Sequence, residues 1–275
     1  MFTDIHSHIV YGIDDGARTL DEAEELVVTD IREGAERIIS TSHYYVDAPS
    51  DPDIIHERLD ELRERLLADG VASPLGNSDA DDDHEPSEFS QDADSESSAE
   101  ETSSRQTIEI IPGNEVLYFD SMVERLDRGE ILTLGNSRYV LVEFYPRESY
   151  QTYVRAVRSL VYAGYTPIIA HAERFKALHE NGLREVRKLG ALVQVSTEPL
   201  SRKGLSGMLD QEASFIRKAL KNQEADFVGT DMHRMSRRPP VARDAEAYIR
   251  KHCSPSYAAD LLSRNADMIL QDFGS

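Results

Sequence analysis

The chain has very few of the residues on which several common protein classes depend. It contains one cysteine and no tryptophan in 275 residues, which excludes a disulfide framework and a cysteine-rich zinc site. Cys253 is followed six residues later by Ala259, where a cysteine-dependent phosphatase needs an arginine. No run of 18 apolar residues occurs and the N-terminus is polar, so we expect a cytoplasmic protein with no membrane span and no secretory signal.

Lysine is scarce and acidic residues are in excess. Lysine accounts for 6 of the 30 basic residues, against 51 acidic residues and a net charge of -21. This charge disfavours nucleic acid as a partner, because it repels the phosphate backbone. Concentrated salt screens such self-repulsion, so the composition also indicates a halophilic host.

One segment, residues 73–106, is unlike the rest of the chain. It carries 11 acidic residues, one arginine and very few apolar side chains. Burial cannot offset the entropy lost on ordering such a segment. We therefore expect a disordered acidic insert within a single domain that spans residues 1–275.

Short β-branched runs alternate with amphipathic runs of helical length around this insert. The expected strands are residues 2–6, 37–41, 107–111, 139–144, 167–171, 192–196 and 226–230. The expected helices include residues 176–189 and 256–271. Such alternation favours an α/β fold with a parallel sheet, open or closed into a barrel.

Histidines and carboxylates cluster where these strands end. They are His6, His8, His43, Glu115, Glu143, His171, Asp231 and His233. The carboxyl ends of parallel strands meet at one face of a barrel, so residues far apart in the sequence would converge there. A lone histidine on a strand is usually a hydrogen-bonded core residue, but this set indicates a site for Mn²⁺, Fe²⁺ or Zn²⁺.

Seven motifs in this order resemble a known family. They are DIHSHIVYGIDDG (4–16), ISTSH (39–43), GNEV (113–116), LGNSRYVLVEF (134–144), GYTPIIAHAERF (164–175), VQVST (193–197) and GTDMHRMSRRPP (229–240). Together they resemble the PHP (polymerase and histidinol phosphatase) superfamily, in particular the bacterial manganese-dependent tyrosine-protein phosphatases of capsule and exopolysaccharide regulation. The resemblance implies a distorted (β/α)7 TIM-like barrel that holds up to three divalent ions, with Mn²⁺ the expected metal.

The resemblance also implies a role for each ligand. The first ion would be bound by His6, His8, Glu115 and Asp231. The second would be bound by Glu115 as a bridge, with His171 and Glu143, and the third by Asp15, His43 and His233. Asp14 is adjacent to Asp15 and could exchange roles with it.

Two arginines are expected to contact the substrate phosphate by the same resemblance, Arg174 and Arg238. A planar guanidinium makes bidentate phosphate contacts that lysine cannot make. For the neighbouring Arg237 we expect an ordinary surface ion pair. Tyr44 and Tyr45 stand where more basic residues would be typical, and we interpret this pair first as packing against the barrel rim.

The implied function is that of a metal-dependent phosphomonoesterase acting on phosphotyrosine in protein, with water activated by the metals as nucleophile. A tyrosine kinase of polysaccharide assembly is the candidate partner. The alternatives are a phosphatase for histidinol phosphate or another small molecule, a PHP-type exonuclease, and a catalytically idle regulatory module that binds a kinase. An amidohydrolase barrel would need a bridging lysine where the chain has Glu143.

Overall fold

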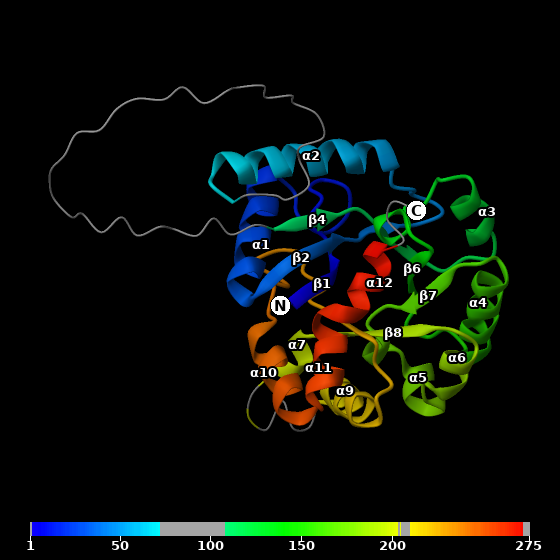
Figure 1. Ribbon diagram of the computed structural model, residues 1–275. Helices are drawn as coiled ribbons and strands as arrows, with labels where there is room; N and C mark the ends of the chain where they lie inside the picture. Colours follow the sequence, from blue (N-terminus) through cyan, green and yellow to red (C-terminus); the bar gives the residue numbers. More distant parts are fainter. Residues whose placement is uncertain (1, 72–107, 203, 205–209, 272–275) are drawn as a thin grey trace, which may run out of the picture.

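The computed structural model describes residues 2–71, 108–202, 204 and 210–271. It shows a curled parallel sheet with helices packed around it (Figure 1). The expected acidic insert, residues 73–106, lies outside the described residues, so its disorder stays a prediction.

Every expected strand region contains a strand. The strands are β1 (Phe2–Ser7), β2 (Ala35–Ser40), β3 (Ser42–Tyr44), β4 (Glu109–Ile111), β5 (Asn114–Leu117), β6 (Tyr139–Glu143), β7 (Thr166–Ile169), β8 (Leu192–Ser196) and β9 (Phe227–Gly229). All paired strands are parallel, in the orders β1-β2-β4 and β3-β5-β6-β7-β8-β9. Short breaks at Thr41 and at Pro112–Gly113 carry the chain from the first sheet into the second. These breaks explain why nine strands are found where the sequence predicts seven.

The sheet curls until its last strand returns to its first. The backbone N–H of His8 donates to the carbonyl of Met232 at 2.9 Å, and that of Asp231 donates to the carbonyl of His6 at 2.8 Å. The α/β architecture and barrel-like curl expected from the sequence are thus confirmed, and the two ends of the ligand set come together at this junction.

The longer helices follow the strands as expected, and two of the expected helices are interrupted. They are α1 (Leu20–Glu33), α2 (Pro52–Ala68), α3 (Met122–Asp127), η1 (Leu134–Asn136), α4 (Tyr150–Tyr162), η2 (Ala172–Arg174), α5 (Lys176–Asn181), α6 (Arg184–Lys188), α7 (Glu198–Ser201), α9 (Gln211–Asn222), α10 (Arg243–His252), α11 (Pro255–Ala259), η3 (Asp260–Arg264) and α12 (Asn265–Gln271). The expected helix 176–189 is broken into α5 and α6, because Gly182 adopts φ 76° and ψ 178°. The expected helix 256–271 contains a π-helical turn, η3, in its middle.

The interior of the curled sheet has its own apolar cluster. Six strands each contribute a side chain to it, namely Ile5, Ile39, Ile111, Leu141, Ile168 and Phe227. Helix α12 adds Ala266 and Ile269, and Figure 1 shows this helix lying across the centre of the ring of strands. A larger cluster fills the space between the sheet and the outer helices. The sheet therefore packs on both faces, as its nearly continuous apolar strands predict.

A buried carboxylate, Asp4, links β1 to the segment after β9. Its Oδ1 accepts hydrogen bonds from the backbone of His6 at 3.1 Å and of Thr230 at 2.9 Å, and its Oδ2 accepts one from the Thr230 hydroxyl. Burial raises the pKa of Asp4 to about 6. Asp30 of α1 is also fully buried, and burial followed by the charge of Asp4 raises its pKa well above the usual value. Neither oxygen of Asp30 has a hydrogen-bond partner among the described residues.

This pair predicts a pH-dependent effect of Asp30→Asn. A carboxyl whose pKa is raised on folding contributes its stability fully below about pH 4, and the contribution is lost as pH rises through the folded pKa. An asparagine amide can donate to Asp4 at any pH. We expect Asp30→Asn to raise the free energy of unfolding relative to the parent by about 1–3 kcal/mol more at pH 8 than at pH 4.5.

Urea unfolding with chelator present measures this difference without a metal contribution. Asp21→Asn, on the exposed side of α1, is the control. An effect of Asp30→Asn that is the same at both pH values would contradict the account.

Candidate metal centre

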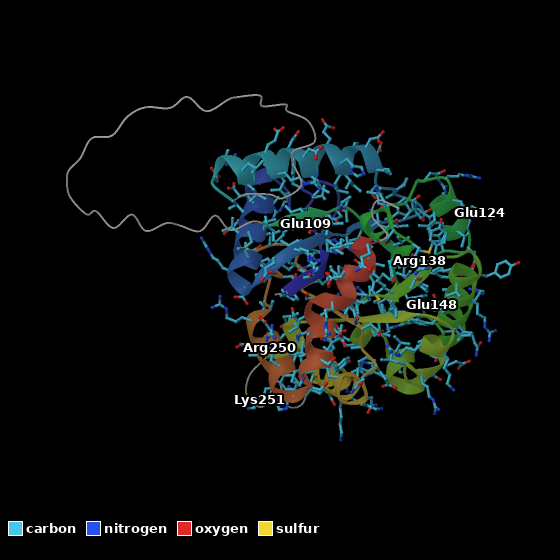
Figure 2. The ribbon with its side chains drawn as sticks, viewed as in Figure 1. Glu109, Glu124, Arg138, Glu148, Arg250 and Lys251 are labelled. Atoms are coloured by element: carbon cyan, nitrogen blue, oxygen red, sulfur yellow. The ribbon has the colours of Figure 1, made fainter. Side chains whose placement is uncertain are left out.

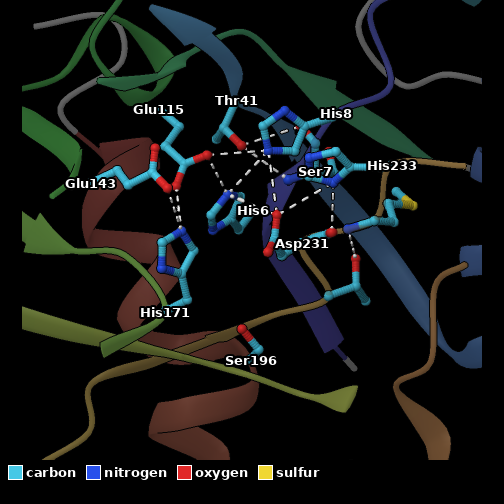
Figure 3. Close-up of polar contacts among 12 residues, drawn as sticks. His6, Ser7, His8, Thr41, Glu115, Glu143, His171, Ser196, Asp231 and His233 are labelled. Atoms are coloured by element: carbon cyan, nitrogen blue, oxygen red, sulfur yellow. Dashed lines mark hydrogen bonds and ion pairs between the residues drawn. The ribbon is translucent and has the colours of Figure 1, made fainter. Parts of the chain in front are cut away.

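All nine expected ligands lie together at the carboxyl ends of the strands. His6 lies on β1, His43 on β3, Glu115 on β5 and Glu143 on β6. His8, Asp15, His171, Asp231 and His233 lie in the segments that follow a strand. Figure 3 shows seven of them, His6, His8, Glu115, Glu143, His171, Asp231 and His233, pointing toward one another.

The first expected group converges closely. Ligand atoms of His6, His8, Glu115 and Asp231 lie within 4.8 Å of one another, and all four residues are buried. Glu115 Oε2 is 3.1 Å from His6 Nε2 and 3.3 Å from His8 Nε2. Asp231 Oδ1 lies 3.4 Å from each of the same two nitrogens. This is the spacing of side chains that can share one small cation.

Glu115 reaches the second expected group with its other oxygen. Its Oε1 is 2.7 Å from His171 Nε2, which lies 3.6 Å from Glu143 Oε1. The structure also places His43 here, with its Nδ1 3.2 Å from Glu115 Oε2 and 3.9 Å from Glu143 Oε2. His43 therefore stands between the second and third groups, whereas the sequence assigns it to the third alone.

The third expected group lies at the open side of the centre. Asp15 Oδ1 is 3.6 Å from His43 Nε2 and 3.3 Å from His233 Nε2. His8, His43 and His233 also have ligand atoms within 4.8 Å of one another. Asp15 is half exposed, so this group is the most accessible of the three.

Asp14 orients two of the expected ligands by hydrogen bonds, whereas Asp15 faces the ligand cluster. Its Oδ2 accepts hydrogen bonds from His8 Nδ1 at 2.8 Å and from the backbone of His43 at 2.9 Å. The partner on Nδ1 leaves the Nε2 of His8 free to face the centre, which is how carboxylates orient metal-binding histidines. The structure thus separates the adjacent aspartates, with Asp15 facing the ligand cluster.

Gln194 is a site residue that the sequence reasoning missed. Its Oε1 lies 3.2 Å from His6 Nδ1 and accepts a hydrogen bond from the backbone of His171 at 2.6 Å. It therefore orients ligands from β1 and from the end of β7. The available signal was its position as the one polar side chain in the middle of the buried strand LVQVS.

The residues fit bound cations by their charge and hydrogen bonding. Glu115 Oε2 and His43 Nδ1 are buried and have no hydrogen-bond partner among the described residues. Burial alone would raise the pKa of Glu115, but His6, His43 and His171 hold it well below its usual value. Burial, followed by the charge of Glu115, raises the pKa of Glu143 to about 8. Several carboxylate oxygens and imidazole nitrogens therefore point their lone pairs at one another with few protons between them. Such an arrangement requires positive charge between the ligand atoms.

Arg174 and Arg238 meet at one oxygen of a ligand. Asp231 Oδ2 is 2.5 Å from a terminal nitrogen of Arg174 and 2.8 Å from one of Arg238. Because Oδ1 of Asp231 faces His6 and His8, this carboxylate can serve an ion with one oxygen and both arginines with the other. The two guanidinium groups are partly exposed and line a cavity of about 500 Å³ with Arg237 and Pro239. Arg237 is exposed and lies 3.7 Å from Asp15 Oδ2, as expected of a surface ion pair.

A curled parallel sheet whose first strand carries His6 and leads into His8, with carboxylates and imidazoles gathered at its rim, defines an α/β-barrel enzyme of the metal-dependent hydrolase type. The chain belongs to the CpsB/CapC family of capsular polysaccharide synthesis, whose model matches residues 2–78 and 71–271. The resemblance drawn from the motifs is confirmed.

Proteins of similar sequence match this chain over nearly their whole length. The tyrosine-protein phosphatase CpsB of Streptococcus pneumoniae is 29% identical over 277 residues, which cover 98% of each protein. The tyrosine-protein phosphatase YwqE of Bacillus subtilis is 25% identical over 276 residues, covering 98% of this chain and 91% of YwqE.

Solved structures agree on the fold. A crystal structure from a study of YwqE and CpsB, described as unique metal-dependent tyrosine phosphatases, matches 98% of this chain and 94% of that one, with a TM-score of 0.77 and 23% identity. A D-hydantoinase from a Bacillus species matches 96% of this chain and 70% of its own, with a TM-score of 0.53 and 12% identity. The second likeness concerns the barrel alone.

The geometry predicts unequal effects for two glutamates of the centre. Glu115 lies within 3.3 Å of expected ligands from all three groups, whereas Glu143 lies no closer than 3.6 Å to His171 and 3.9 Å to His43. We expect Glu115→Ala to lose at least half of the bound divalent metal and Glu143→Ala to retain most of it, because a bridging carboxylate holds two ions.

Elemental analysis after dialysis against a fixed metal concentration measures the difference. Glu124→Ala, on the exposed face of α3 (Figure 2), is the matched control. Equal metal content in the two centre variants would show that Glu115 does not act as a bridge.

Proposed function

We propose that this chain is a metal-dependent protein-tyrosine phosphatase. The observation that carries the proposal is the contact of Arg174 and Arg238 with Asp231, a member of the Glu115-centred ligand set. The relatives CpsB and YwqE are named tyrosine-protein phosphatases, which supports the proposal. A site with this full ligand set favours an active enzyme over an idle binding module.

The chain's own residues would divide the work as follows. His6, His8 and Asp231 would hold a first ion, with Glu115 bridging to a second ion at His171 and Glu143. Asp15, His43 and His233 would hold a third at the open side. Divalent ions in such a site lower the pKa of bound water and neutralise phosphate oxygens.

Arg174 and Arg238 would orient the phosphate. Each guanidinium is held on Asp231 Oδ2 by one nitrogen, so its other N–H groups remain available to phosphate oxygens. A phenolate leaving group has a pKa of about 10, far below that of an alkoxide. Strong proton donation to the leaving group is therefore unnecessary, and we assign no residue to it.

The metal, partner and location belong to the same proposal. Mixed imidazole and carboxylate ligands suit Mn²⁺, with Fe²⁺ or Zn²⁺ as alternatives. The partner would be a phosphotyrosyl protein, with a tyrosine kinase of polysaccharide assembly as the candidate. Among the described residues, no helix is long and apolar enough to cross a membrane, and we propose a cytoplasmic location. If the host is halophilic, this protein should require molar salt to fold. Thermal unfolding of the protein across a salt series tests this.

A substrate comparison tests the proposed activity. Hydrolysis is measured on a phosphotyrosyl peptide, the matching phosphoseryl peptide, histidinol phosphate and single-stranded DNA, each with Mn²⁺ and with chelator, at low and molar salt. We expect turnover of the phosphotyrosyl peptide, lost with chelator and restored by Mn²⁺. Full activity after chelation would reject the metal role, and preference for histidinol phosphate or DNA would favour the corresponding alternative.

The proposed phosphate contacts of Arg174 and Arg238 can be tested by substitution. We expect Arg174→Ala and Arg238→Ala each to lower kcat/KM on the order of 10²-fold, because each removes a preorganised phosphate contact. Lysine at either position should restore part of the loss, since it keeps the charge without the fork.

Arg250→Ala, at an exposed position on α10 (Figure 2), is the control. Metal content is measured in parallel, because both arginines also touch Asp231. A fall in activity that merely follows a fall in metal content would make them supports of the ligand and not phosphate contacts.

A further inference from the structure

One tyrosine is set apart from the others by what it packs against. Of the twelve tyrosines, nine lie in or against the two apolar clusters, and Tyr145 and Tyr162 are exposed. Tyr45 is half-buried, yet it packs against neither cluster formed by the described residues. Its neighbour Tyr44 is fully buried and stacks on Phe119, so the expected packing role holds for Tyr44 only.

Tyr45 packs on a residue of the metal centre instead. Its ring stacks on the ring of His43, with centroids 4.9 Å apart and planes at 27°. Side chains alternate along a strand, so Tyr45 continues the side on which His43 faces the centre. The backbone N–H of Ala48 donates to the carbonyl of Tyr45 at 3.1 Å, which closes a tight turn and fixes the backbone that carries the ring.

Tyr45 lies at the partly exposed edge of the metal centre. Its ring is half-buried and packs on His43, whose Nδ1 lies 3.2 Å from Glu115 Oε2 and 3.9 Å from Glu143 Oε2. A partly exposed aromatic ring is thus fixed one residue beyond Tyr44 and beside His43. A phosphate ester bound at the centre would carry its organic group toward solvent, and Tyr45 offers a partly exposed aromatic ring that packs on His43.

We propose that Tyr45 is a specificity-determining residue whose ring contacts the aromatic ring of an aryl phosphate and so favours phosphotyrosine over alkyl phosphates. The inference rests on the proposed phosphatase activity and adds to it the group that recognises the ester side of the substrate. Aromatic pairs contribute an interaction beyond their buried area that corresponds to about 3- to 10-fold in affinity. The effect belongs in substrate binding, because the ring is no closer to the phosphate in the transition state than in the ground state.

The test compares Tyr45→Ala, Tyr45→Leu and Tyr45→Phe in the Mn²⁺-loaded protein, with Tyr162→Ala on α4 as the control. Tyr162 is 94% exposed. We expect Tyr45→Ala to raise KM for phenyl phosphate about 3- to 10-fold with little change in kcat. Tyr45→Phe should behave as the parent, and Tyr45→Leu should fall between the two.

Calorimetric binding gives a readout that does not depend on turnover. Tyr45→Ala should weaken phenylphosphonate binding and leave methylphosphonate binding unchanged. If both phosphonates weaken equally, or metal content falls, Tyr45 only supports His43 and the inference is overturned. Unchanged phenylphosphonate binding also overturns it. A parent protein that binds phenylphosphonate through Tyr45 but hydrolyses no phosphate ester would reject the proposed function and keep the inference.

Discussion

The arrangement of this site depends on one buried carboxylate, Glu115, on which imidazoles from distant strands converge. Its two oxygens lie within 3.3 Å of nitrogens from four histidines. In a site shielded from water such crowding is tolerable only with positive charge between the ligands. The position of Glu115 therefore constrains where β1, β3 and the end of β7 can lie.

A second buried carboxylate, Asp4, stabilises the closure of the barrel between β1 and the segment after β9. Asp4 accepts hydrogen bonds from the backbone of His6 and from Thr230, the residue before Asp231. Two ligands of the first group, 225 positions apart in sequence, are thereby fixed by one buried side chain. A second carboxyl, that of Asp30, is buried next to Asp4, and burial together with the charge of Asp4 raises its pKa. The fold keeps an electrostatically unfavourable pair next to the ligands that it positions.

The sequence predicts the sheet, the order of its elements and the nine side chains that converge at the strand ends, because alternation, strand-end polarity and motif order are local signals. It cannot separate Asp14 from Asp15, since only the hydrogen bonds of Asp14 to His8 and to the His43 backbone distinguish them. It misses the break at Gly182, where a single backbone conformation divides a helical pattern. The role of Tyr45 also depends on which neighbour its ring meets, and no sequence pattern specifies that. Which ligands lie together also depends on the tertiary structure, as the position of His43 between the second and third groups shows.

The central claim is that Glu115 bridges ions in a polynuclear centre. Anomalous X-ray diffraction at the manganese absorption edge, on crystals of the Mn²⁺-loaded protein, tests it most directly. The account predicts at least two anomalous peaks, one within ligand distance of each Glu115 oxygen, with the first also contacting His6 and His8. A single peak, or peaks that leave the Glu115 side chain uncoordinated, would contradict it.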